Sequence, residues 1–261
     1  MTRILSFGGG VQTSYLLLKH YERYNAVIFA DVGAGDRTHG EEQITYFILD
    51  TIIEPFCKRM NLPLLIRDDG ESLWDYSIRK KIIPVRFPRW CTDKKKKRVI
   101  RKTLTKELGA KRPTKKQDGN VITQDIGFTI DESDRMKIDL DEPQYVKSEY
   151  PLIDMKITRQ DCIEWLNKHY PFVFKTIVNN NKLVLDDWKY AKSGCWFCMF
   201  TKKENINNYT NWQKSEIIKL EKNNPRYPEM ILRNKPMEEL FRKKNMVLEE
   251  FEQCSDGSCF T

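Results

Sequence analysis

Apolar and polar positions in the first part of the chain follow two spacings in turn. Residues 3–7 and 26–30 are short apolar runs of strand length, and residues 13–24 between them carry apolar side chains at helical spacing. Two strands joined by a helix form a βαβ unit with parallel strands and a right-handed crossover. The pattern predicts the α/β class, with an open, mostly parallel, Rossmann-like sheet flanked by helices.

Later segments extend this alternation. Residues 68–90 are rich in loops, Gly109 ends a strongly basic helical stretch, and Thr158 begins another helix with a capping box. We predict helices over residues 41–60, 92–108, 158–169, 211–222 and 236–244, and strands over residues 64–66 and 121–128. The resulting division is an α/β domain over residues 1–155 and a small helical, cysteine-bearing extension over residues 156–261.

Three glycines, Gly8 to Gly10, separate the first strand from the first helix. Glycine permits positive φ and lets an anion approach the backbone, while the N–H groups and positive dipole end of the following helix point at it. Thr13 and Ser14 add hydroxyl donors. The spacing is neither a Walker A loop nor G-x-G-x-x-G. It predicts a phosphate cradle of another kind, with a plain strand-to-helix turn as the alternative.

Acidic and basic groups follow the predicted strands. Asp31 lies at the carboxyl end of the second strand, where ligands bind in open α/β sheets, although it can equally cap a turn. Residues 127–137 place Asp131, Glu132 and Arg135 in one turn. Carboxylates suit Mg²⁺ and arginine suits phosphate charge, whereas an ordinary surface ion pair is the alternative.

The charge distribution and the cysteines indicate further kinds of binding partner. Residues 79–120 carry 17 Lys and Arg against 3 acids, a balance of +14, whereas the whole chain has a net charge of +8. Such a basic stretch suits a polyanion or forms a solvated helix face. Cys91, at the start of the basic helix, lies where neighbouring cations lower a thiol's pKa. The chain begins directly with a strand and has no apolar span, so we expect a reducing, cytoplasmic protein without a membrane segment.

Two cysteine pairs near the carboxyl end predict a metal site. Cys195 and Cys198 form C-x-x-C, and Cys254 and Cys259 form C-x-x-x-x-C. Four thiols suit Zn²⁺ or an iron–sulfur cluster, and aromatic neighbours favour [4Fe–4S]. A redox dithiol with a tail that binds no metal is the alternative.

Taken in order, these motifs resemble the PP-loop ATP pyrophosphatases, in particular the branch related to phosphoadenosine phosphosulfate (PAPS) reductase. GGGVQT stands where the family has S-G-G-x-D-S, with Gly8 in place of serine and Gln12 in place of aspartate. FADVG resembles F-x-D-T-G, RWCT resembles R-x-C-T, and GFTIDESDR resembles G-x-x-x-D-E-x-x-R. Cys195 and Cys198 also match the branch's C-x-x-C, so the resemblance covers most of residues 1–200.

The resemblance implies an ATP site and a set of reacting groups. It implies ATP binding by Ser6, Phe7, Gly8, Gly9, Gly10, Gln12, Thr13, Ser14, Phe29, Ala30 and Gly127. It implies roles in the reaction for Asp31, Cys91, Asp131, Glu132 and Arg135, with Mg²⁺ as cofactor. An acceptor oxygen then attacks the α-phosphate of ATP, and pyrophosphate leaves. The adenylated oxygen is then displaced from the acceptor, often by sulfur.

We therefore expect an ATP-dependent enzyme that inserts sulfur into DNA or tRNA, as in DNA phosphorothioation or tRNA thiolation, with a cysteine desulfurase as a candidate sulfur donor. One alternative is a PAPS or adenylylsulfate reductase, whose terminal E-C-G-x-x-H segment has no counterpart here. Another is a zinc-containing nucleic-acid-binding protein without enzymatic activity. That alternative leaves the glycines and the acidic turn unexplained.

Overall fold

The computed structural model describes residues 2–85, 89–114, 119–138, 142–178, 181–191, 194–201 and 209–224. Cys254, Cys259 and the helix predicted over residues 236–244 lie outside these ranges. None of the helices in the described ranges combines the length and apolar character that a bilayer crossing requires.

A five-stranded sheet forms the centre of the fold, in the order β3-β2-β1-β4-β5, with every neighbouring pair parallel. Its strands are β1 (Arg3–Phe7), β2 (Ala26–Ala30), β3 (Leu64–Arg67), β4 (Ile122–Asp125) and β5 (Val146–Glu149). The predicted α/β class with a parallel sheet is therefore confirmed. β1 and β2 have the predicted bounds, whereas β5 was not predicted.

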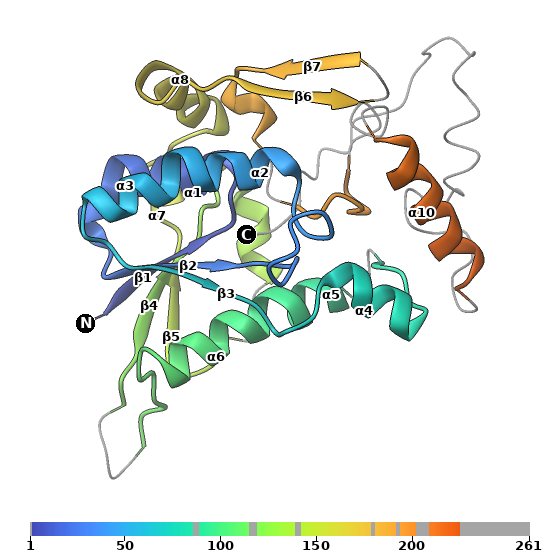
Figure 1. The fold of residues 1–261 in the computed structure, drawn as a ribbon. Coiled ribbons are helices and arrows are strands. Elements are labelled where there is room, and N and C mark those ends of the chain that lie inside the picture. Colours follow the sequence, from blue (N-terminus) through green and yellow to red (C-terminus); the bar gives the residue numbers. More distant parts are fainter. Residues whose placement is uncertain are drawn as a thin grey trace.

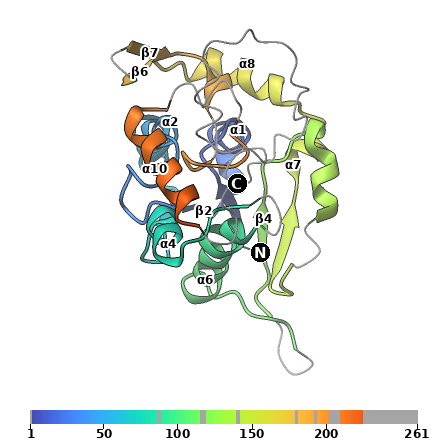
Figure 2. The same ribbon diagram turned by 90° about the vertical axis from the view of Figure 1, so that its right-hand side faces the viewer.

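Helices cover both faces of the sheet, as Figures 1 and 2 show. The helices are α1 (Val11–His20), α2 (Gln43–Ile48), α3 (Glu54–Arg59), α4 (Leu73–Lys80), α5 (Trp90–Thr92), α6 (Arg98–Lys106), α7 (Pro151–Asp154), α8 (Arg159–His169) and α10 (Asn211–Lys222). The 3-10 segments are η1 (Tyr21–Arg23), η4 (Ile130–Ile138) and η5 (Trp188–Tyr190), and the π-helical segments are η2 (Leu49–Ile53) and η3 (Asp93–Lys97).

Alternation along the strands divides the core into two layers. Leu5 and Phe7 of β1 pack in one cluster with apolar residues of α1, α3 and α8. Ile4 faces the other side and packs with Ile28 and the α6 residues Val99 and Leu104. Successive strand residues point to opposite faces, so this alternation places α1 and α6 on opposite sides of β1.

Segments after residue 150 join the same structure. Thr158 caps α8 with the predicted capping box, in which its hydroxyl accepts from the Asp161 N–H. Cys162 and Leu166 of α8 belong to the cluster that contains α1. The division at residue 155 stays a prediction. An antiparallel hairpin of β6 (Phe174–Val178) and β7 (Asn181–Leu185), also not predicted, follows α8.

Candidate functional site

The strand order reverses between β1 and β4, because β2 and β3 lie on one side of this pair and β5 on the other. In open parallel sheets, ligands bind outside the carboxyl ends of the strands at such a switch point. The glycine turn follows β1 and Gly127 follows β4, so both predicted segments lie there. A Cβ at Gly127 would come within 2.8 Å of Thr13 Cγ2 and 3.1 Å of Thr13 N, which shows how closely the two segments approach.

The glycine turn is bonded internally. Gly9 has φ +77°, and the Thr13 hydroxyl accepts from Gly8 N and donates to Gly10 O, both at 3.3 Å. Ser14 Oγ is buried without a hydrogen-bond partner among the described residues. The Thr13 hydroxyl therefore serves the turn itself, contrary to its expected role as an anion donor. The backbone N–H groups at the start of α1 remain the groups suited to hold phosphate.

Four polar side chains, which we call the Gln12 cluster, meet beside the start of α1: Gln12, Glu132, Arg135 and Arg159. Gln12 Nε2 donates to Glu132 Oε2 at 3.0 Å, and Arg159 donates from Nη1 to Gln12 Oε1 at 3.0 Å. Glu132 also pairs with Arg135, whose guanidinium lies 4.1 Å from the centre of the Phe128 ring. The structure thus brings Gln12 together with two predicted site residues, Glu132 and Arg135, that lie more than a hundred positions later in the sequence.

Arg159 was missed by sequence reasoning. It is the first residue of α8, and burial lowers the pKa of its guanidinium. Its backbone N–H donates to Asp131 Oδ2 at 2.8 Å, so Asp131 anchors the start of α8 while Glu132 turns toward Gln12. The only sequence signal was its position directly after the Thr158 cap, which does not distinguish it from an exposed helix residue.

Asp31 is buried and fully engaged. Its carboxylate accepts from Gly33 N at 2.9 Å, Gly35 N at 3.1 Å and the Tyr46 hydroxyl at 2.6 Å. These bonds support the alternative in which Asp31 caps the turn after β2. Phe29 and Ala30 are also buried, so any contact from them to a nucleotide comes from their backbone.

The lysine run turns largely inward. Lys95 is only 2% exposed, and its ammonium lies 2.7 Å from Asp69 Oδ1 and donates to Glu71 O. Lys96 pairs at 2.8 Å with Glu41, whose side chain is fully buried. Lys95 and Lys96 therefore pair with carboxylates within the fold, and polyanion binding by the rest of the basic stretch stays a prediction. Burial also raises the pKa of Glu41, although Lys96 opposes this shift.

Three thiols gather in one cavity. Cys91, Cys195 and Cys198 line it together with Arg89 and Phe200. Trp196 and Phe197 are buried in the same cluster as Cys195, and their rings meet the Trp74 ring in tilted and edge-on contacts at centroid distances of 4.8 and 4.9 Å. The dry aromatic surroundings expected for the C-x-x-C pair are present, and Cys91 is an additional thiol that spacing did not connect with them.

The pKa of Cys91 shifts opposite to the expected direction. Burial raises the pKa of its thiol, and the neighbouring Cys198 raises it further, whereas Arg89 opposes these effects only in part. The pKa of Cys195 is also raised, through its hydrogen bond with Cys198 and its burial. Burial of Cys91 therefore opposes the lowering of its pKa that its basic neighbours predicted, and its role in the reaction stays a prediction.

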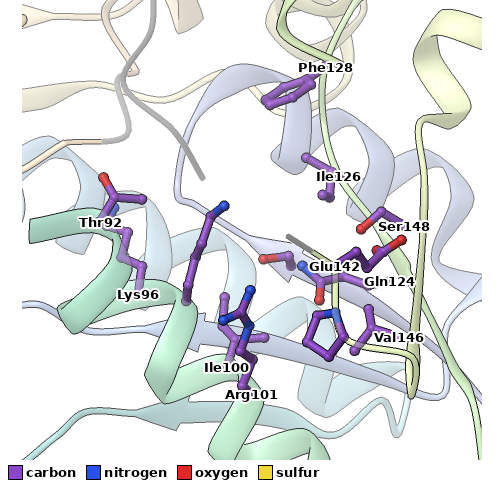
Figure 3. A pocket seen from close by; sticks show the side chains of 13 residues that line it. Thr92, Lys96, Ile100, Arg101, Gln124, Ile126, Phe128, Glu142, Val146 and Ser148 are labelled. Carbon is purple, nitrogen blue, oxygen red and sulfur yellow. The ribbon is translucent and has the colours of Figure 1, made fainter. Parts of the chain in front are cut away.

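A second cavity lies against the face of β1, β4 and β5 that is turned toward α6. Figure 3 shows Thr92 and Lys96 on one side of it, and Gln124, Val146 and Ser148 on the other. Thr92 and Lys96 also line the thiol cavity. The two cavities therefore adjoin through a shared wall, and they place the thiols next to the switch point of the sheet.

The metal site stays a prediction. Among the described residues, no group of three or more His, Cys, Asp and Glu side chains is arranged to hold a metal ion. The two terminal cysteines, Cys254 and Cys259, lie outside that part of the chain. Comparisons with models of protein families, with curated proteins and with solved structures find no match for this chain.

Proposed function

We propose that this chain is a PP-loop ATP pyrophosphatase that adenylates an acceptor for sulfur insertion into nucleic acid. One observation carries the proposal: a glycine turn and a helix start lie at the switch point, with the Gln12 cluster beside them. Backbone N–H groups there suit a polyphosphate, and Arg135 suits the charge that develops on departing pyrophosphate. Glu132 offers carboxylate oxygens of the kind Mg²⁺ prefers, and the ion would neutralise phosphate charge.

The experiment is release of pyrophosphate from ATP and Mg²⁺, measured with and without tRNA or single-stranded DNA. We expect Arg135→Met to slow release about 100-fold, because it removes a cation from the site of charge development. Arg98→Met is the matched control, since Arg98 is 68% exposed on the outer face of the basic helix. Absence of pyrophosphate release by the unaltered protein with any acceptor would contradict the function.

The thiol cavity supports a metal or cluster in this enzyme. Cys195 and Cys198 would supply two ligands, and Cys91 is placed to supply another, in addition to or instead of a terminal cysteine. Thiolates suit both zinc and iron–sulfur clusters. A cluster would supply sulfur or electron chemistry next to the switch point, whereas zinc would hold the fold of the extension.

Metal content tests this assignment. We expect Cys198→Ala and Cys91→Ala to lose most of the metal bound by anaerobically purified protein, with a brown colour identifying iron–sulfur and a colourless metalloprotein identifying zinc. Cys57→Ala is the control, because Cys57 belongs to α3 and is buried in the core. Unchanged metal content in either variant would remove that cysteine from the ligand set.

The remaining alternatives are less well supported. A nucleic-acid-binding protein with structural zinc would use the basic stretch and the cysteines, but it gives no role to the glycine turn at the switch point. A PAPS or adenylylsulfate reductase needs the terminal nucleophile segment that the sequence lacks. The zinc-protein alternative also leaves the Gln12 cluster beside the glycine turn without a role.

A further inference from the structure

Polar residues interrupt the apolar face that β4 and β5 turn toward α6. On β4, Gln124 stands two positions after Ile122 and two before Ile126, and on β5, Ser148 stands two positions after Val146. Gln124 and Ser148 are direct partners across the two parallel strands. Because strand side chains alternate between faces, both project into the cavity beside α6.

These polar side chains are not used by the fold. Neither Gln124 nor Ser148 forms a side-chain hydrogen bond with another residue in the described part of the chain, and both are half-buried. Half-buried polar groups on a packed sheet face need a partner in water or in a ligand. The carboxamide of Gln124 can both donate and accept, which suits the edge of a heterocyclic base.

Apolar and aromatic side chains form much of the remaining wall, and the Glu142 carboxylate stands at its edge together with Ser6 and Thr92. Ile100, Ile126 and Val146 line it, and Phe128 closes it. The Phe128 ring stacks on Tyr150 at a centroid distance of 5.5 Å and an interplanar angle of 18°. Apolar walls, a fixed ring and a hydrogen-bonding amide together suit a planar heterocycle removed from its stack.

Three cations line the cavity, and one of them, Lys96, is paired with Glu41. Lys97 and Arg101 line it from the basic helical segment, four positions apart and hence on one helix face. They lie where they can contact a phosphate attached to a base bound against Gln124. This side of the sheet differs from the one on which α1 packs, so the cavity is separate from the glycine turn.

We propose that this cavity binds one unstacked nucleotide of a single-stranded nucleic-acid acceptor, with its base against Gln124 and Phe128 and its phosphate against Lys97 and Arg101. The inference rests on the proposed function, because it names the acceptor that this function requires. Through Thr92 and Lys96, a nucleotide held there adjoins the thiol cavity. The acceptor thus lies between the ATP site and the thiols.

The test measures binding of a fluorescein-labelled single-stranded oligonucleotide of about 12 nucleotides in the absence of ATP. Gln124→Leu keeps the side-chain volume and should weaken binding about tenfold, because the base loses its hydrogen bonds. Arg101→Gln should reduce the slope of log affinity against log salt by about one, as expected for one lost phosphate contact. Gln160→Leu is the matched control on the exposed surface of α8.

A nonhydrolysable ATP analogue is titrated in parallel, with circular dichroism confirming that each variant is folded. Unchanged oligonucleotide affinity in Gln124→Leu together with an unchanged salt slope in Arg101→Gln would overturn the inference. The inference would also be overturned if the two variants lost affinity only for the ATP analogue, because the cavity would then be assigned to ATP itself. Failure of the unaltered protein to bind the analogue would defeat the proposed function alone, since the oligonucleotide measurement does not involve ATP.

Discussion

Replacing Gly9 with alanine should lower the free energy of unfolding by about 2–5 kcal/mol, before any effect on nucleotide binding is considered. The φ of +77° costs a residue with a side chain about 1–2 kcal/mol. A Cβ would also lie 2.3 Å from Thr45 Cγ2, and such overpacking adds about 1–3 kcal/mol. The sequence indicated that Gly9 leaves room for phosphate, but the structure shows that it first leaves room for Thr45.

Urea unfolding of two further variants separates these contributions. Thr45→Ser removes the methyl group that the new Cβ would meet. In a Thr45→Ser background, Gly9→Ala should therefore lower the free energy of unfolding by about 1–3 kcal/mol less, because the overpacking is gone. Gly70→Ala is the control for strain alone, because Gly70 has φ +85° and a Cβ added there would meet no other residue within 4 Å. Equal losses in Gly9→Ala and Gly70→Ala would show that contact with Thr45 is unimportant. ATP binding is then measured in the rescued double variant.

Replacing Lys96 with methionine should lower the free energy of unfolding by about 3–5 kcal/mol at neutral pH, because it leaves the fully buried Glu41 carboxylate without its cation. Glu41→Gln combined with Lys96→Met should be close to neutral, since neither charge then remains. The control is Lys94→Met, because the Lys94 ammonium donates to the Tyr76 hydroxyl and no buried carboxylate depends on it.

The loss in Lys96→Met should depend on pH in a defined direction. Burial raises the pKa of Glu41 in the folded protein, so the folded state holds its proton at a pH where the unfolded state has released it. The penalty is therefore full above the folded-state pKa of Glu41, fades as the pH falls from there, and is gone at the unfolded pKa of about 4.3. Urea unfolding at several pH values measures this. A loss that is small at neutral pH, or that grows on acidification, would contradict the role of the pair.

Local signals explain which elements were predicted well. β1 and β2 are apolar runs bounded by turn residues, and α8 starts at a Thr158 cap whose partner lies three positions away. Elements that need distant partners were missed. β5 is four residues long and contains charged residues, so its strand character depends on pairing with β4. The region predicted to be loops contains α4, which Ser72 caps. The buried face of α4 packs against the aromatic residues around the thiols, so this helix also depends on distant partners.

The sequence by itself determined the parallel α/β class, the glycine turn after β1 and the residue types of the site, because strand periodicity, caps and glycine turns act over a few residues. Only the tertiary structure decided which of these residues meet. Gln12 reaches Glu132, Cys91 joins Cys195 and Cys198 in one cavity, and Lys95 and Lys96 turn inward. The order of the strands and the packing of α6 against the sheet determine which of these residues come into contact. Neither can be predicted from the spacing of residues within a single motif.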